Sequence, residues 1–452
     1  MTTFPSRIFS IVTVCLLVSM TMTMSGCAGL GNMFGGDEEP QDKLKGERIS
    51  IMELQTRLEP EAQTDGQTYT VPSSWKNDFW PQQGGYPNHA MHNPALPQSP
   101  LKQAWRSSIG RGSTSSLPLS NMPIVIDGKI FTMNTRSEIY AFSTETGERL
   151  WRTDVTKDGE GDAVIGGGIA ASRSKIYVTN GYDEALKLNS ETGDIEWRVT
   201  LPTAARAAPT ILGGRVFIQT LGNEVVTLAA SDGDLLWTHR AISETSGLLG
   251  APSPAANNDV VVPGYSSGEV FALRIENGGV AWQDNLSPQQ RLGGMGSLSD
   301  IRAMPVLDRG LVIAISFGGR LVAIDQRTGR RIWQREIGGS ETPWVSGDSV
   351  FVLSSQNRLV SFERETGDIL WVRDLPRFED DDEEEPIVMY GPVMGGGRLF
   401  VTSSDSTVYE IDPVNGEVLT SWETGDELAG PAVIASETLY LLGESGRLMA
   451  YR

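Results

Sequence analysis

The amino-acid sequence predicts an all-β fold, an eight-bladed β-propeller whose N-terminal strand completes the last blade. Three observations support this prediction. A pattern of strand, Gly turn and Trp returns about every 45 residues, a second hairpin precedes most copies of it, and the two chain ends look like complementary halves of one copy. A period of about 40–45 residues with four strands per unit is typical of propeller blades.

The repeat consists of an apolar strand, a polar turn that ends in Gly, and a second strand with Trp four residues after that Gly. Apolar residues alternate in its first strand, as at 321–324, which is the periodicity of a half-buried strand. Gly adopts a positive φ in the turn at low cost, and a Trp ring can fill the gap between neighbouring sheets. The pairs are Gly147 and Trp151, Gly193 and Trp197, Gly233 and Trp237, Gly278 and Trp282, Gly329 and Trp333, Gly367 and Trp371, and Gly416 with Thr420 in the Trp position.

Earlier hairpins, at 125–131, 211–217, 307–313 and 394–400, supply two more strands per repeat. Residues 446–452 look like the first strand of the pattern with no Trp strand after it. Residues 101–110, with Trp105, look like a Trp strand with nothing before it. We therefore expect a ring over residues 99–452 that the N-terminal strand closes, which removes free edges. A seven-bladed ring is the alternative.

Residues 1–26 have the features of a secretory signal. Arg7 is the only charged residue before Asp37, and the apolar run 8–18 is too short to span a bilayer comfortably. Small residues before Cys27 resemble a bacterial lipobox, which predicts cleavage before Cys27, a lipid on that residue and, with Ala at position 28, delivery to the outer membrane. An ordinary signal peptide with an incidental Cys is the alternative.

Composition excludes several classes of protein. A formal net charge of -20 leaves no basic surplus for binding nucleic-acid phosphates. Cys15 and Cys27 are the only two cysteines, too few for a disulfide framework or a Cys-based zinc site.

Residues 27–98 begin as a Gly-rich and charged tether, and their Pro-rich part is expected to run extended over the folded body. His89 and His92 lie in that part, and two ligands on an irregular segment are too few for a metal site.

The repeat Ala-x-Asp-x-x-Thr-Gly-x-x-x-Trp, clearest at 323–333, resembles the quinoprotein-type propeller repeat. Two bacterial groups carry this repeat: quinone-dependent dehydrogenases and the BamB family of outer-membrane assembly lipoproteins. Resemblance to the dehydrogenases would imply a quinone (PQQ), a calcium ion held by Glu, Asn and Asp, and, in many of them, a disulfide between adjacent cysteines. We find no such constellation in the sequence. A dehydrogenase-like protein and a propeller that binds a glycan or other small ligand in its channel are the alternatives.

Resemblance to the BamB family covers nearly the whole chain, and the segment 298–338 is especially similar. It implies a non-catalytic scaffold without cofactor or metal, held by its lipid on the periplasmic face of the outer membrane. It further implies docking to the POTRA domains of BamA, the central barrel-assembly protein. Other lipoproteins of that machinery and unfolded outer-membrane proteins are further implied partners.

The resemblance places docking on two neighbouring loops. The family's Leu-x-Leu-Arg-Gly stretch corresponds to Leu248, Leu249 and Gly250, with Leu249 in the place of Arg. Its Ser-Asp-x-Asp stretch corresponds to residues beginning at Ser299, where Asp300 matches and Arg302 reverses the second charge. Turn capping by Asp300 and packing between blades by the two leucines are the alternative roles.

Two further segments invite functional interpretation. Residues 379–385 are seven consecutive acids, which we interpret as a solvated insertion because no calcium-loop pattern is present; a patch facing a basic partner is the alternative. The Gly-rich stretch 293–296 is followed by neither a helix signal nor a phosphate-binding Lys, so it does not predict a phosphate site.

Overall fold

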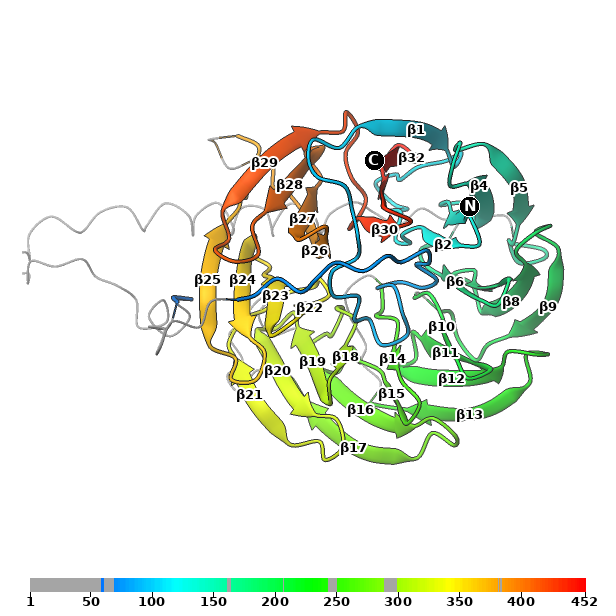
Figure 1. The fold of residues 1–452 in the computed structure, drawn as a ribbon. Helices are drawn as coiled ribbons and strands as arrows, with labels where there is room; N and C mark the ends of the chain where they lie inside the picture. The colour runs from blue at the N-terminus through cyan, green and yellow to red at the C-terminus, as the bar shows by residue number, and fades with distance from the viewer. Residues whose placement is uncertain are drawn as a thin grey trace, which may run out of the picture. The chain divides into compact units, whose positions relative to one another are not determined.

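Eight four-stranded antiparallel sheets surround a central axis, which confirms the predicted eight-bladed propeller (Figure 1). The structure is a computed structural model, and it describes residues 58–60, 69–160, 164–205, 207–242, 250–287, 299–380, 382 and 384–452. All 32 elements in this part of the chain are strands. Accordingly, no described element is a helix with the length and apolar character needed to cross a membrane.

Each blade runs from an inner strand at the axis to an outer strand at the rim. Blade 1 is β2 (Ile124–Ile126), β3 (Lys129–Met133), β4 (Glu138–Ser143) and β5 (Arg149–Asp154), and blade 2 is β6 (Gly168–Ser172), β7 (Lys175–Thr179), β8 (Glu184–Asn189) and β9 (Ile195–Thr200). Blade 3 is β10 (Thr210–Leu212), β11 (Arg215–Thr220), β12 (Glu224–Ala229) and β13 (Leu235–Arg240), and blade 4 is β14 (Ala255–Ala256), β15 (Val260–Val262), β16 (Glu269–Arg274) and β17 (Val280–Asn285). Blade 5 is β18 (Val306–Asp308), β19 (Leu311–Ser316), β20 (Arg320–Asp325) and β21 (Arg331–Arg335), and blade 6 is β22 (Trp344–Ser346), β23 (Ser349–Leu353), β24 (Arg358–Glu363) and β25 (Ile369–Asp374). Blade 7 is β26 (Met389–Gly395), β27 (Arg398–Ser403), β28 (Thr407–Ile411) and β29 (Val418–Glu423), and blade 8 is β30 (Val433–Ala435), β31 (Thr438–Leu442), β32 (Arg447–Tyr451) and β1 (Gln103–Ser108).

The ring closes through blade 8, where strands from both ends of the chain pair. β1 lies antiparallel beside β32, with Trp105 opposite Ala450. The pairing extends past the strand ends, because Lys102 and Arg452 exchange two backbone hydrogen bonds of 2.8 and 2.9 Å. The predicted closure by the N-terminal strand is therefore confirmed, and the seven-bladed alternative is wrong.

The repeated Gly and Trp form the joints between blades. The Trp of one blade packs over the Gly of the next, so that a Cβ added at Gly147 would lie 2.6 Å from the Trp105 ring. Gly147 also has a φ of +71°, as the turn requires. Six indole Nε1–H groups donate across the joint to a carbonyl of the following blade, at 2.7–3.2 Å: Trp105 to Thr144, Trp151 to Ser190, Trp237 to Ile275, Trp282 to Gln326, Trp333 to Arg364, and Trp371 to Pro413.

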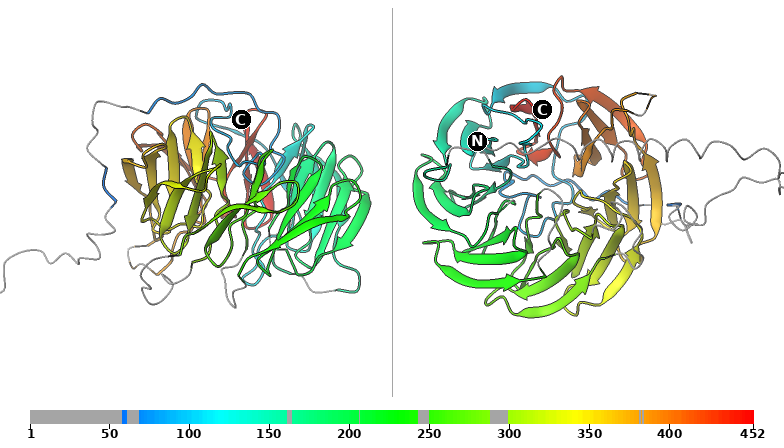
Figure 2. Two further views of the ribbon diagram at one scale, coloured as in Figure 1. Left: turned by 90° about the horizontal axis from the view of Figure 1, so that it is seen from below. Right: turned by 180° about the vertical axis from the view of Figure 1, so that it is seen from behind.

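Residues 69–100, which we call the strap, cross the axis on one face of the ring and form a circuit (Figure 2). Going along the strap, its residues bond to blades 8, 1, 2, 3, 4, 5, 6 and 7 in turn. The contacts lie at or beside the inner strands, whose backbone groups otherwise face the axis. The bonds are Ser436 N–H to Asn77 O, Trp80 with Val125, Ala171 N–H to Pro81 O, Gln82 with Ile211, Ala256 N–H to Pro87 O, Leu307 N–H to Asn88 O, Trp344 Nε1–H to His92 O, and Gly396 N–H to Pro94 O, all at 2.7–3.0 Å.

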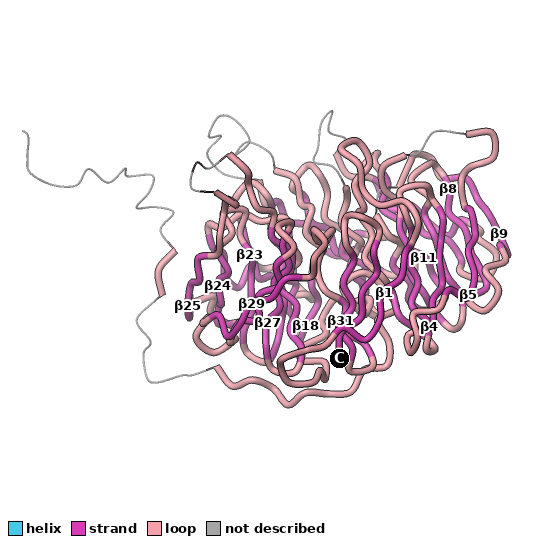
Figure 3. The backbone as a smooth tube through the Cα atoms, turned by 90° about the horizontal axis from the view of Figure 1, so that it is seen from above, coloured by secondary structure: helices cyan, strands magenta, loops and turns pink. Residues whose placement is uncertain are grey.

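The circuit gives the propeller two unlike faces. The strap face carries the strap and the hairpin turns that join the first and second, and the third and fourth, strands of a blade. The opposite face carries the connections from each outer strand to the inner strand of the next blade, and we call it the connection face (Figure 3). Extension of the Pro-rich segment over the folded body is thus confirmed, and the strap closes the axis from one side.

Candidate functional site

An axial cavity of about 210 Å³ opens on the connection face. It is lined by residues from the connections that lead into the inner strands, including Asn121, Gly166, Ala208, Arg302 and Glu341. Gln83 of the strap also belongs to its wall. The cavity is therefore a depression at the centre of one face, with the strap beneath it.

Two of the three predicted docking residues that the structure describes meet at the wall of this cavity. Gly250 and Arg302 both line it, and a Cβ added at Gly250 would lie 3.8 Å from Arg302 Nε. Arg302 is exposed. Leu248 and Leu249 lie outside the described residues.

Asp300 differs from Arg302 in being buried, with 6% of its surface exposed. Its backbone carbonyl accepts the Phe317 amide at 2.9 Å, and the neighbouring Ile301 amide donates to Tyr265 O at 3.3 Å. Ile301 is fully buried and occupies the space that a side chain at Gly264 would need. This segment is thus pinned between blades 4 and 5, an arrangement that suits Asp300 to hold the loop and Arg302 to present charge.

A smaller inner cavity of about 60 Å³ continues from the axial one. Gln83, Met122, Met304, Glu341 and Thr342 line both cavities. Glu341 accepts a hydrogen bond from the Gly391 amide at 3.0 Å, and within the described part of the chain its carboxylate has no ion-pair partner. Burial raises the pKa of Glu341, partly opposed by the Gly391 hydrogen bond and the Arg302 charge.

His89, from the strap, contributes a neutral ring to the wall of the inner cavity. Its Nδ1 lies 2.7 Å from Pro305 O, and since a carbonyl only accepts, Nδ1 carries the proton and Nε2 a lone pair. Nε2 is buried and has no hydrogen-bond partner in the described structure. Burial lowers the pKa of His89 to about 4. Gly84 makes room for the ring, because a Cβ there would lie 2.9 Å from His89 Cδ2.

His92 faces elsewhere, with its Nε2 3.2 Å from Asp308 Oδ1. The two histidines of the strap therefore do not converge. Among the described residues no group of three or more His, Cys, Asp or Glu side chains could hold a metal ion.

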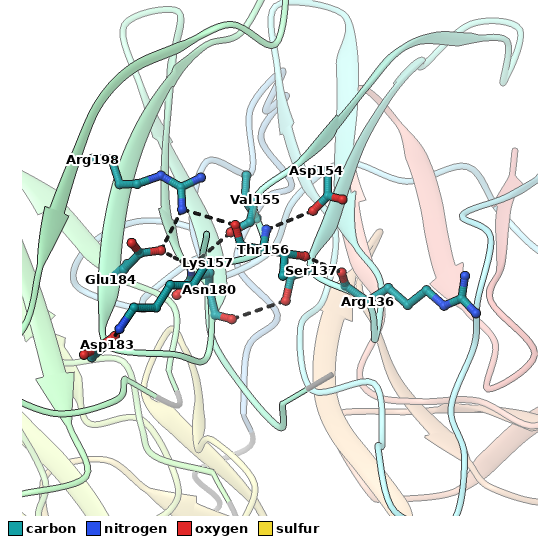
Figure 4. Close-up of polar contacts among 10 residues, drawn as sticks. All are labelled: Arg136, Ser137, Asp154, Val155, Thr156, Lys157, Asn180, Asp183, Glu184 and Arg198. Atoms are coloured by element: carbon teal, nitrogen blue, oxygen red, sulfur yellow. Dashed lines mark hydrogen bonds and ion pairs between the residues drawn. The ribbon is translucent and has the colours of Figure 1, made fainter. Parts of the chain in front are cut away.

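Polar joints stiffen the connection face between blades 1 and 2 (Figure 4). Asn180 Nδ2 donates to Val155 O at 3.0 Å and to Glu184 at 2.7 Å. Arg198 Nη1 donates to the same Glu184 oxygen at 2.7 Å and to Thr156 O at 3.2 Å. Lys157 and Asp183 form an ion pair of 2.5 Å at the edge of this network. The face therefore presents its loops from a rigid base.

The acidic insertion lies on the same face, between blades 6 and 7. Its described members are exposed, and Glu379 N–H donates to Glu385 O at 2.9 Å, so the segment begins and ends as a small hairpin. The predicted solvation of these described residues is confirmed. The Gly-rich stretch 293–296 lies outside the described residues, as do Cys15 and Cys27.

Sequence reasoning missed Glu341 and the polar joints, and it considered His89 only as a metal ligand. Glu341 and His89 carry no motif, since one lies in a short connection and the other in an irregular segment. The joints do leave a signal: Asn134 and Glu138 in blade 1 have the same spacing as Asn180 and Glu184 in blade 2, and Asn134 Nδ2 likewise donates to Glu138 at 2.7 Å.

Comparison with known proteins gives similarities along the whole ring. A family model described as outer membrane protein assembly factor BamB matches residues 102–164, 135–373 and 350–452. The outer membrane protein assembly factor BamB of Yersinia pestis is 26% identical over 361 residues, which cover 78% of this chain and 89% of that protein.

Solved structures share the fold at lower identity. BamB from Moraxella catarrhalis has a TM-score of 0.67 at 20% identity, covering 78% of this chain and 99% of that one. The quinohemoprotein alcohol dehydrogenase of Comamonas testosteroni has a TM-score of 0.65 at 14% identity, covering 84% of this chain and 81% of that one. At these identities the two structures agree with the propeller architecture and nothing finer.

Proposed function

The chain belongs to the outer membrane protein assembly factor BamB family, and from this premise we propose that it is a non-catalytic scaffold of the outer-membrane β-barrel assembly machinery. The observation that carries the proposal is the family match, which spans the ring from β1 to β32. In the proposed role the propeller binds the POTRA domains of a BamA-type protein and aids the folding and insertion of barrel proteins. Other lipoproteins of the machinery and unfolded barrel proteins are further proposed partners.

Docking on the connection face is the finer part of the proposal. Arg302 supplies an exposed charge beside Gly250, and Ile301 and Asp300 hold its loop in place. Loops on a rigid scaffold are the usual location of binding residues. We assign Leu248 and Leu249 to the same surface, where they would add apolar contact to the charge of Arg302.

The proposed role includes a location in the cell, which rests on the N-terminal residues. Residues 1–26 would be removed as a signal peptide, and Cys27 would carry the acyl chains that hold the protein on the periplasmic face of the outer membrane. Several chains on one Cys give firm anchoring, whereas a single chain is marginal. Within the proposed segment 27–98, the strap is the part that packs on the propeller.

The size of the axial cavity favours a scaffold over a dehydrogenase that holds its quinone on the axis. Sites for small molecules occupy about 300–1,000 Å³, whereas the axial cavity measures about 210 Å³. A larger cavity of about 890 Å³ lies away from it, on the strap face beside the turns of blades 1, 2 and 3. The strap also fills the axis from the other side with Trp80 and His89, both buried.

A pull-down of the full-length lipoprotein from its own envelope in mild detergent, read by mass spectrometry, tests the proposal. We expect a POTRA-containing barrel protein to be recovered. Arg302→Glu with Leu248→Ala should reduce its recovery about tenfold or more. Arg327→Glu is the matched control, because Arg327 is also an exposed arginine and lies in a blade 5 hairpin turn on the strap face.

Each outcome decides something. Equal recovery with both variants would keep the scaffold and overturn the docking residues. No POTRA-containing partner with any of them, together with dye reduction by an alcohol in the presence of quinone and calcium, would favour the dehydrogenase alternative. Retention on peptidoglycan in place of the partner would favour a glycan-binding propeller.

A further inference from the structure

The axial and inner cavities together form a blind pocket with an acidic end. Of the charged side chains that line the two cavities, Arg302 lies at the rim and Glu341 is shared by both cavities. The strap closes the pocket from the opposite face with Trp80, Gly84 and His89. A ligand would therefore enter from the connection face and meet acceptors at the inner end.

The polar atoms of the inner end favour a hydrogen-bond donor with positive charge. Glu341 is a carboxylate without an ion-pair partner in the described structure, and the Nε2 of His89 is an acceptor without a partner. The His89 ring is neutral at neutral pH, so its Nε2 is an acceptor there. Glu341 is half-buried. A carboxylate that is partly withdrawn from water without a counter-charge is costly, and a bound cation would offset that cost.

Three kinds of cation can be considered as ligands of this pocket: a divalent metal, a guanidinium and a primary ammonium. A divalent metal needs more ligands than Glu341 and His89 provide, and no third His, Cys, Asp or Glu joins them among the described residues. A guanidinium prefers both oxygens of a carboxylate, but the Gly391 amide already bonds to one oxygen of Glu341. A primary ammonium is a compact point charge with three donors, which suits one carboxylate oxygen and one imidazole nitrogen.

We propose that this axial pocket binds a primary ammonium group, with Glu341 as the counter-charge and His89 as a second acceptor. The source we assign is a lysine side chain of the protein that docks on the connection face, and this assignment rests on the proposed function. A lysine seated at the centre of the docking face would act as an anchor, because buried central contacts dominate binding energy.

Histidine NMR gives a direct test, since the chain has three histidines. The full-length lipoprotein in detergent, labelled with ¹⁵N-histidine, is titrated with n-butylammonium chloride. We expect a saturable shift of the His89 Nε2 signal, while His92 and His239 serve as internal references. The controls are n-butanol, which has the same chain without charge, and tetramethylammonium, which has the charge without N–H donors.

Two variants should change the affinity in opposite directions. Glu341→Gln keeps the side-chain shape and an acceptor for Gly391, and it should weaken n-butylammonium binding about tenfold or more. Arg302→Gln removes the repelling charge at the rim and should tighten binding about twofold to fivefold. Thermal unfolding of both variants checks that the ring is intact, so that a loss of binding is not a loss of fold.

The possible outcomes test the ammonium site and the proposed lysine of the partner separately. No saturable shift, or the same shift with n-butanol, would overturn the site and leave a pocket that holds only water. A purified POTRA-domain partner that binds and shifts His89 Nε2 supports the lysine source. A partner that binds without that shift overturns the lysine source, and a partner that does not bind contradicts the proposed function while the n-butylammonium titration still decides the site.

Discussion

The Trp333 ring lies directly over Gly367 of the next blade, so close that a Cβ on Gly367 would be 2.5 Å from the ring atom Cδ2. The indole Nε1–H of Trp333 donates to Arg364 O at 2.8 Å in the same turn. The Gly and the Trp of the repeat are therefore partners across two blades and not within one. This relationship explains why both residues recur together along the chain.

Gly367→Ala tests this joint. Its φ of +75° strains any L-residue, and the new Cβ would also meet the Trp333 ring. We expect a loss of about 2–4 kcal/mol in the free energy of unfolding, measured by chemical denaturation. Gly128→Ala is the control, because Gly128 has a φ of +70° with no atom within 4 Å of the added Cβ. Its loss should be only about 1–2 kcal/mol, and equal losses would contradict the packing role.

The periodic part of this fold could be predicted from sequence because every blade has the same local structural requirements. Alternating strands, a turn that needs positive φ and a ring that fills a joint give every repeat the same residues. The strap could not be predicted in the same way. Each of its residues faces a different blade, and bonds such as Asn77 Nδ2 to Ile434 O join residues 357 positions apart. Backbone bonds of this kind leave no pattern of residue types.

The strap makes a second prediction. Gln82 holds both backbone groups of Ile211, with Oε1 accepting at 2.8 Å and Nε2 donating at 3.0 Å. Gln82→Ala leaves a buried amide and carbonyl unpaired, so we expect a loss of about 1–3 kcal/mol. Hydrogen exchange of the Ile211 amide should become faster.

The control for this experiment is Gln98→Ala, because Gln98 is exposed and makes one long contact of 3.4 Å to Arg398. That change should cost less than about 0.5 kcal/mol. Unchanged exchange at Ile211 in Gln82→Ala would show that the strap does not hold the inner strand.

His89 predicts a pH dependence of stability. Its pKa is about 4 in the folded protein against an ordinary value of 6.5, so below pH 6.5 the unfolded chain binds a proton that the folded chain does not. Stability from the neutral ring is therefore complete above pH 6.5 and is lost as the pH falls toward 4, by about 3 kcal/mol in total.

Comparison with His89→Asn isolates this effect from the titration of carboxylates. Asn also tolerates the positive φ of 59° at this position. The difference in unfolding free energy between the two proteins should shrink as the pH falls from 6.5 to 4. A constant difference across that range would mean that His89 titrates normally and that its ring is not held neutral by burial.

Asn180 predicts the strength of the polar joints. The side chain is fully buried and bonds to Val155 O and Glu184 across blades 1 and 2. Asn180→Ala should lower the free energy of unfolding by about 2–3 kcal/mol, because it leaves a buried carbonyl and a buried carboxylate with fewer donors.

The matched change is Asn415→Ala, at an exposed turn where the side chain only accepts the Glu417 amide at 2.9 Å. A loss below about 1 kcal/mol is expected there. Similar losses for the two changes would argue that the joints between blades add little beyond ordinary turn bonds.

The candidate site was only partly within reach of sequence reasoning. Resemblance located the loop that carries Arg302, which the structure places at the rim of the axial cavity. It could not distinguish Arg302 from Asp300, two residues away, because burial depends on Tyr265 and Phe317 of adjoining blades. Glu341 can be recognised as a cavity residue only in the folded ring, where the eight connections between blades converge on the axis.

The circuit of the strap has a consequence for the order in which the molecule is made. Synthesis runs from the N-terminus, so residues 69–100 leave the ribosome before any blade exists. Their bonding partners are spread from Val125 to Ser436, nearly the length of the remaining chain. The strap is therefore made before every blade, but all of its bonds can form only after the last blade has been made.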